Sequence, residues 1–271
     1  MSFVINKTDK NDEVFSREQY IKDRLLFNYI EGARQYEQTE FFSDKKHIII
    51  CKKENNNSVW IWTDDEVCDN KDVVIAIANV IKTFDTPYLQ FFMKPSVAHM
   101  FSDIYALISC ELDCRVKEEF SLGVYKFAQK KIDIPENLGV IKYNKKYSDE
   151  LFEFYKSFQE DFRWSDEKLK KIVNKYKTLE TFMLLKNGEI ISVCVLCDDD
   201  GDYSSIRSVV TKHEHRNKGY GTLVTNIACQ KCEKGGKEKI MLYANNGNHS
   251  AISAFKNAGF EHAGDVFLIK S

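Results

Sequence analysis

The stretch VVTKHEHRNKGYGT, residues 209–222, decides how this sequence is interpreted. Its first residues favour a strand, and helical spacing of apolar residues begins after Thr222. Gly219 and Gly221 lie between the two elements, together with basic side chains at positions 216 and 218. Backbone N–H groups at a helix start lack partners and carry the positive end of the helix dipole, so they bind phosphate. The stretch therefore predicts a strand, an anion-binding loop and a helix.

This pattern does not identify a nucleotide site by itself. It lacks the Gly-Lys-Ser/Thr ending of a P-loop and the three glycines of a dinucleotide fingerprint. A helix start with a solvated basic turn is the alternative interpretation. A second motif follows in LYANNGNHSAISAFKNAGF, residues 242–260, where a strand leads to Asn248 and a short helix that Gly259 terminates.

The two motifs, in this order and on these elements, resemble the acetyl-CoA-binding motifs of the GNAT superfamily of N-acyltransferases. The resemblance covers roughly residues 138–271, and the chain is similar to a branch of bacterial predicted acetyltransferases that carry a degenerate N-terminal half. It implies that a central strand faces the pantetheine arm, that a loop wraps the pyrophosphate, and that a helix flanks the thioester. The residues implied are Val209 and Thr211 for the strand, Arg216, Asn217, Lys218, Gly219, Tyr220, Gly221 and Thr222 for the loop, and Asn248 and Phe255 for the helix.

The resemblance also implies roles in catalysis, and here the sequence departs from the family pattern. A backbone N–H near Val210 would polarise the acyl carbonyl and stabilise the oxyanion. Many members carry tyrosine as general acid where this chain has Phe255, which cannot donate a proton. Tyr243 is the substitute donor that we expect. Glu214 and the acidic cluster 198–202 are possible bases, although a solvated turn is the more common role of such residues.

The function that the resemblance implies is N-acetyl transfer from acetyl-CoA, as acyl donor substrate, to a primary amine by direct attack, without a metal. A non-catalytic acyl-CoA-binding or interaction module is the alternative, because the usual acid and base are missing. We expect a small-molecule or peptide amine as acceptor, and a monomer or homodimer. The net charge of −2 argues against a nucleic-acid partner, and the short apolar runs argue against a membrane segment, so we expect a cytoplasmic protein.

Eight cysteines raise the question of zinc, because two Cys-x-x-Cys pairs, 194/197 and 229/232, have spacing that fits a four-thiolate site. The first pair lies in a strand pattern, where residues three apart point to opposite faces. The second pair lies in a helical pattern without a zinc-knuckle turn. Reduced, buried thiols are therefore the favoured interpretation.

A polar segment with a proline and a glycine at residues 130–139 predicts a domain boundary. We expect a degenerate GNAT-like N-terminal domain at 1–130 and an acetyl-CoA-binding N-acetyltransferase domain at 138–271. The expected fold class is α/β, of the mixed α+β kind, with two GNAT-like halves that each contain a mixed twisted sheet flanked by helices. In the first half we expect a helix over 16–36, but no central strand with a glycine loop between Asp65 and Lys71. Duplication and convergence both explain the shared order of elements.

Overall fold

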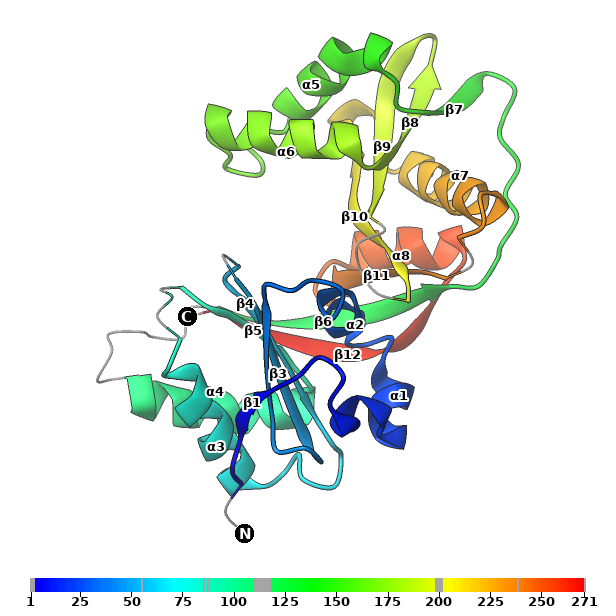
Figure 1. Ribbon diagram of the computed structural model, residues 1–271. Coiled ribbons are helices and arrows are strands. Elements are labelled where there is room, and N and C mark those ends of the chain that lie inside the picture. Colours follow the sequence, from blue (N-terminus) through cyan, green and yellow to red (C-terminus); the bar gives the residue numbers. More distant parts are fainter. Residues whose placement is uncertain are drawn as a thin grey trace.

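The strands of the protein form one continuous mixed sheet. The computed structural model describes residues 3–54, 56–84, 86, 88–109, 118–197, 202–237 and 239–270. Within them the twelve-stranded sheet has the order β1-β2-β3-β4-β5-β12-β6-β11-β10-β9-β8-β7 (Figure 1). The strands are β1 (Asn6–Thr8), β2 (Thr39–Ser43), β3 (Ile48–Lys53), β4 (Ser58–Thr63), β5 (Gln90–Met93), β6 (Glu118–Phe127), β7 (Leu138–Lys142), β8 (Glu180–Lys186), β9 (Glu189–Cys197), β10 (Ser204–Thr211), β11 (Ile240–Asn245) and β12 (Phe260–Lys270).

Helices cover both faces of the sheet. They are α1 (Glu18–Asp23), α2 (Asn28–Ala33), α3 (Lys71–Ile81), α4 (Pro95–Ser109), α5 (Ser148–Lys156), α6 (Asp166–Thr178), α7 (Tyr220–Lys234) and α8 (His249–Ala258), with short 3-10 turns η1 (Glu13–Ser16), η2 (Lys145–Tyr147) and η3 (His213–His215). The buried side chains of α3 and α4 share one apolar cluster, and α7 packs with Ala258 of α8 in a second cluster. Successive side chains of a strand point to opposite faces of the sheet. The cluster under α2 and the cluster under α5 and α6 therefore lie on the face opposite to α3, α4 and α7. The expected mixed α/β class is confirmed.

From each edge of the sheet toward its centre, five strands follow one another in chain order. β1 to β5 form one half and β7 to β11 the other, and β12 and β6 lie between them. Only β4 with β5 and β10 with β11 pair in parallel among the described strands. Each parallel pair is linked by one helix, α3 or α7, and followed by another, α4 or α8. This correspondence supports duplication over convergence.

The two halves exchange their central strands. β6 ends the first half of the chain but pairs with β11 of the second half through residues 122–126. β12 ends the second half but pairs with β5 of the first half through residues 267–270. β6 and β12 also pair with each other along their whole length. The halves are therefore joined by strand pairing as well as by the linker between β6 and β7.

Two local features of the second half follow from the preferences of their residues. The Ser165 hydroxyl accepts a hydrogen bond from the Lys168 N–H and caps α6. Asn187 and Gly188 form the turn of the β8–β9 hairpin, with φ values of 51° and 84°, and those two residue types adopt positive φ with the least strain.

One expectation for the first half is wrong. The helix expected over 16–36 is broken into η1, α1 and α2, and the break lets Tyr20, Phe27 and Ile30 enter the same buried cluster. The segment between Asp65 and Lys71 contains no strand, as expected, and the parallel neighbour of β5 is β4, which ends at Thr63. The segment after it, residues 64–70, contains no glycine and four carboxylates, so it repels rather than attracts a phosphate.

Ion-paired side chains fill the place where β4 and β5 end. The Lys94 ammonium lies 2.6 Å from a carboxylate oxygen of Asp23 and 2.6 Å from one of Asp65. The indole N–H of Trp62 donates to the same Asp23 oxygen at 2.8 Å. Only 7% of Lys94 and 8% of Asp23 are exposed. This buried network bridges the two strand ends of the first half.

Candidate functional site

The second half opens between its two parallel strands. β10 and β11 pair only from Ser204 to Ile206 and from Ile240 to Leu242. Beyond this point β10 continues along β9, and β11 continues along β6, so no ladder joins the two strands to each other. The backbone groups that face this opening are available to an extended ligand chain.

A β-bulge at Arg207 determines which side chains face each side of the opening. The register of β10 with β9 shifts between Ile206 and Ser208. After the shift, Val209 packs against the cluster under α7, whereas Val210 packs against the cluster under α5 and α6. Val209 and Thr211 lie on the strand beside the opening, and their contact with a cofactor stays a prediction.

The expected role of the Val210 N–H requires a correction. Lys212 donates its N–H to the Ile191 carbonyl of β9. Hydrogen-bonded pairs alternate along an antiparallel ladder, so the Val210 N–H also points to β9. The N–H groups of Val209 and Thr211 point the other way, toward β11. A ligand in the opening therefore meets the Val209 N–H and not that of Val210.

The loop after β10 has the backbone geometry that its glycines predict. Asn217 and Gly219 adopt positive φ values of 59° and 77°, and Gly219 is the N-cap of α7. A Cβ at Gly221 would lie 3.3 Å from the Thr211 hydroxyl. This hydroxyl is hydrogen-bonded to the Ser192 hydroxyl at 2.8 Å. The first turn of α7 is thus held close to the end of β10, and its N–H groups have no partner within the helix.

The polar side chains of the loop form hydrogen bonds and packing contacts within the protein. Arg216 donates to the Thr211 carbonyl at 3.2 Å and lies 3.7 Å from Asp161. The Lys218 ammonium donates to the Glu214 carbonyl at 2.8 Å. The Thr222 hydroxyl donates to a carbonyl of α8, and the Tyr220 ring packs against His215. These contacts fix the loop, while its cations remain near the α7 N-terminus.

The two residues predicted on the α8 side also contact the protein. The Asn248 side chain caps α8 by accepting from the Ala251 N–H at 3.1 Å. Phe255 is partly buried and meets Phe260 edge to face, with ring centroids 6.2 Å apart. Both residues lie on the helix that follows β11, on the α7 side of the sheet.

Tyr243 joins the two halves. Its hydroxyl donates to the Leu26 carbonyl at 2.9 Å, and its ring lies 5.6 Å from that of Trp60. A proton-donating role would require the hydroxyl to leave this carbonyl. The acidic turn that offered possible bases lies outside the described residues except for Asp202, and Glu214 lies in η3.

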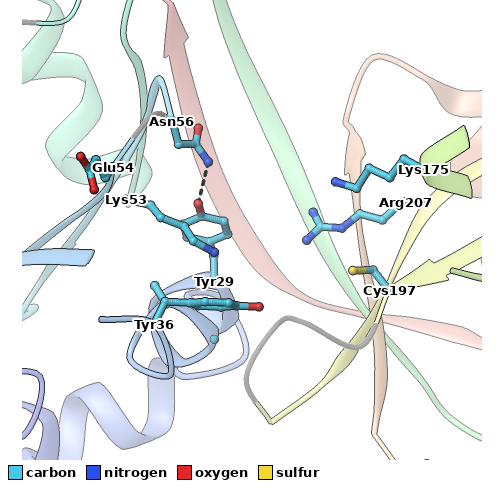
Figure 2. Close-up of a pocket in the computed structure, with 10 residues that line it drawn as sticks. Tyr29, Tyr36, Lys53, Glu54, Asn56, Lys175, Cys197 and Arg207 are labelled. Atoms are coloured by element: carbon cyan, nitrogen blue, oxygen red, sulfur yellow. Dashed lines mark hydrogen bonds between the residues drawn. The ribbon is translucent and has the colours of Figure 1, made fainter. Parts of the chain in front are cut away.

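A cavity of about 320 Å³ lies between the halves on the α2 and α6 side of the sheet (Figure 2). The first half contributes the aromatic rings of Tyr29 and Tyr36 and the polar hairpin turn after β3, and the second half contributes Arg207 of the bulge. Among the described residues, the lining consists of Tyr29, Gly32, Ala33, Tyr36, Lys53, Glu54, Asn56, Lys175, Cys197 and Arg207. Sequence reasoning did not find this cavity, because its walls are distant in the chain.

A group of hydroxyls lies beside the bulge. The Tyr155 hydroxyl is 3.4 Å from that of Ser208, and the rings of Tyr155 and Tyr176 are 5.2 Å apart. Burial raises the pKa of Tyr155 and, to a smaller extent, that of Tyr176, so both phenols stay protonated at neutral pH. Tyr155 and Tyr176 are distant from Ser208 in the sequence, so no local pattern links the three residues.

A second, open cavity of about 720 Å³ lies over the α5–α6 loop. Trp164 lines this cavity and stacks on Phe162, with ring centroids 4.5 Å apart. The His213 Nε2 lies 2.7 Å from a carboxylate oxygen of Asp161. Asp161 therefore links the α5–α6 loop to the loop that follows β10.

The cysteine pairs have the orientation that the strand pattern predicts. Cys194 is buried in the cluster under α7 together with Cys229 and Cys232, whereas Cys197 lines the cavity between the halves. Burial raises the pKa of Cys194 and of Cys229 above that of a free thiol.

The family comparison supports the resemblance of the second half. Residues 147–260 match the model of the acetyltransferase (GNAT) family. No curated protein matches the chain in sequence. None of the helices in the described ranges is long and apolar enough to cross a membrane.

Solved structures extend the similarity to the whole chain. A Drosophila protein matches with a TM-score of 0.67 at 11% identity, covering 99% of this chain and 98% of that one. A GNAT-family acetyltransferase from Colwellia psychrerythraea matches with a TM-score of 0.59 at 11% identity, covering 99% of both chains. A tandem GNAT protein from the clavulanic acid biosynthesis pathway has a TM-score of 0.53 at 11% identity, with 98% and 97% covered. At these identities the similarity establishes the fold, including its two-half arrangement.

Proposed function

Because residues 147–260 match the model of the GNAT acetyltransferase family, we propose that this protein transfers an acetyl group from acetyl-CoA to a primary amine. The observation that carries the proposal is the opening between β10 and β11, which lies next to the glycine loop and the N-terminus of α7. An extended pantetheine arm requires backbone partners along one strand, and its pyrophosphate requires unpaired N–H groups at the end of that strand. The second half of this chain offers both.

We propose that the loop 216–222 receives the pyrophosphate through the N–H groups of the first turn of α7. Gly221 has no side chain where the loop approaches β10, so the anion can come close to the backbone. The Val209 N–H is the oxyanion donor in this proposal, because it points to the opening and would stabilise the negative charge that develops on the acyl oxygen.

The remaining acceleration comes from positioning. When the amine is bound within attack distance of the thioester, its translational freedom has already been lost on binding. The activation free energy of the transfer step is therefore lower, even without an acid or a base. A thiol has a pKa near 8.5, so the coenzyme thiolate departs at neutral pH with modest help. Phe255 in place of an acid is compatible with this chemistry.

We also propose a division of labour between residues 1–130 and 138–271. The second half would hold acetyl-CoA. The first half has an acidic, glycine-free segment after β4 and a buried ion-pair network between its strand ends, so it would support and complete the acceptor side without binding a cofactor.

Calorimetry with acetyl-CoA alone tests the binding part of the proposal. We expect one site per chain, and a lack of binding at millimolar acetyl-CoA would refute the assignment. Release of free thiol with a panel of primary amines then distinguishes an enzyme from a non-catalytic acyl-CoA-binding module. Binding without thiol release for any amine would favour the module.

A further inference from the structure

The first half carries three metal-ligating side chains near the place that corresponds to the glycine loop of the second half. His47 directly precedes β3, and Asp64 and Glu66 lie in the segment that follows β4. One ligand atom of each side chain, a ring nitrogen or a carboxylate oxygen, lies within 4.8 Å of those of the other two. The segment after β4 and the loop after β10 correspond, because each connects the first strand of a parallel pair to the following helix.

Backbone hydrogen bonds hold these three residues together. The Asp64 N–H donates to the His47 carbonyl at 2.8 Å, so the two residues lie opposite each other where β3 begins and β4 ends. The Asp44 carboxylate accepts the His47 N–H at 2.7 Å and fixes the turn before β3. The Asp64 carboxylate accepts the Glu66 N–H at 3.1 Å, which turns the chain after β4. The group is therefore largely formed by the fold itself.

The imidazole of His47 has a ring nitrogen that the protein does not use. Its Nδ1 is buried and has no hydrogen-bond partner in the described part of the chain. The Asp64 carboxylate oxygen beside it is 3.9 Å away, which is beyond hydrogen-bond distance, and only 6% of that side chain is exposed. A buried polar atom without a partner costs free energy, and a cation bound to Nδ1 would remove this cost. The unpaired nitrogen indicates a ligand between the side chains.

The distances suit a cation with short bonds to nitrogen and oxygen. Zinc binds histidine nitrogen and carboxylate oxygen at about 2.0–2.2 Å, so its ligands lie about 3.4 Å apart in a tetrahedron. The distance between His47 and Asp64 has to shorten by only about half an ångström to reach this value. Glu66 is exposed, so its side chain can rotate toward the cation. An imidazole with two carboxylates favours a transition-metal cation over Mg²⁺, which prefers oxygen ligands.

The charges around the group are compatible with a cation. Lys94 pairs with Asp65 at 2.6 Å, which holds the middle of the acidic segment against the buried network and leaves its neighbours on either side to the group. Arg17 is a competitor for Asp64, because its guanidinium lies 3.9 Å from the carboxylate. The Arg17 side chain is 39% exposed, so it can turn to solvent when a cation binds.

We propose that His47, Asp64 and Glu66 bind a divalent transition-metal cation, with Zn²⁺ as the first choice, and that water completes its coordination. The cation would hold the acidic segment after β4 onto the β3–β4 hairpin and so stabilise the first half. In the second half the corresponding loop is basic and rich in glycine. This proposal goes beyond acyl transfer and does not depend on it.

Calorimetry with Zn²⁺ on the full chain, after treatment with a chelator, tests the site. We expect one Zn²⁺ at this site and binding of Mg²⁺ that is weaker by about a hundredfold or more. Glu66→Gln and His47→Leu should each raise the dissociation constant of Zn²⁺ by about tenfold or more, because each removes a ligand. Asp69→Asn is the matched control, since Asp69 is an exposed carboxylate of the same segment outside the group, and its dissociation constant should stay within about threefold. Wild-type affinity in Glu66→Gln or in His47→Leu would overturn the proposal.

Cobalt distinguishes this site from binding to thiols. Co²⁺ replaces Zn²⁺ in sites with nitrogen and oxygen ligands and absorbs visible light there, whereas a thiolate ligand adds a strong near-ultraviolet charge-transfer band. Cys68 is a free, partly exposed cysteine two residues after Glu66. We expect a visible Co²⁺ spectrum without the thiolate band, and the same spectrum in Cys68→Ser. A thiolate band that disappears in Cys68→Ser would overturn the proposal.

The melting temperature measures the stabilising role. Zn²⁺ at about a hundred times its dissociation constant should raise the melting temperature of the wild type and of Asp69→Asn by roughly 5 °C, and excess chelator should reverse the rise. The same Zn²⁺ concentration should raise that of Glu66→Gln by about half as much or less. No rise in the wild type, or an equal rise in Glu66→Gln, would overturn the proposal.

Discussion

Gly221→Asp is expected to remove acetyl-CoA affinity without lowering the stability of the protein. Gly221 is the second residue of α7, after its N-cap at Gly219. A carboxylate in the first turn of a helix interacts favourably with the dipole, and aspartate at a helical position replaces the more flexible glycine. The steric cost is small, because the new Cβ meets the Thr211 hydroxyl at 3.3 Å and needs a shift of only a few tenths of an ångström.

The loss of affinity follows from the charge. If the introduced carboxylate lies about 5 Å from the nearest pyrophosphate oxygen, at an effective dielectric constant of about 20, the repulsion is about 3 kcal/mol. This corresponds to a dissociation constant raised by on the order of a hundredfold. Gly221→Ala adds the same Cβ without the charge and should weaken binding by less than about tenfold.

Calorimetry with acetyl-CoA measures the affinity, and the melting temperature of the ligand-free protein measures the stability. The expected combination is weak binding with an unchanged or raised melting temperature for Gly221→Asp. Raising the salt concentration should recover part of the affinity, because the repulsion is screened. Wild-type affinity in Gly221→Asp would show that the loop does not bind the pyrophosphate.

Four further variants address other parts of the structure. Lys94→Met should lower the free energy of unfolding by about 3–5 kcal/mol, as for removal of one partner from a buried ion pair, and a denaturant titration that finds less than about 1 kcal/mol would contradict the bridging role of Lys94. Residues 1–130 alone should give a poorly dispersed NMR spectrum and bind no acetyl-CoA, since β5 and β6 lose their partners β12 and β11; specific binding would refute the proposed division of labour. Phe255→Tyr should preserve kcat or raise it by up to about tenfold, and a tenfold loss would mean that the ring packs differently from our proposal. Tyr243→Phe should lower stability by about 1 kcal/mol through its bond to the Leu26 carbonyl and reduce kcat by less than about a hundredfold; complete loss of turnover with intact acetyl-CoA binding would identify Tyr243 as a dedicated acid.

The parts of the site that depend on local geometry could be predicted from the sequence. The loop at Gly219 requires a positive φ, and the sequence places a glycine at that position. The cap at Ser165 and the turn at Asn187–Gly188 are likewise set by residues within a few positions of one another. Each of these predictions uses a preference that a short peptide already has.

The parts that depend on distant pairing could not be predicted. The orientation of the Val210 N–H depends on the bulge at Arg207, because a shift of one residue turns every following backbone group toward the other neighbour. The exchange of β6 and β12 is decided by which edges meet in the folded protein, and the sequence of each strand is compatible with either partner. The cavity between the halves follows from that exchange and was missed for the same reason.

The exchange of central strands also determines the order in which this chain can become structured during synthesis. Residues 1–130 leave the ribosome with the inner edge of β5 uncovered, and its partner β12 is made only after nearly the whole second half. The first half therefore stays incomplete until residues 260–270 arrive, although its helices and its own hairpins can form earlier. A nascent chain of this protein carries an unpaired strand edge for most of its synthesis, so its dependence on chaperones should fall sharply once β12 is complete.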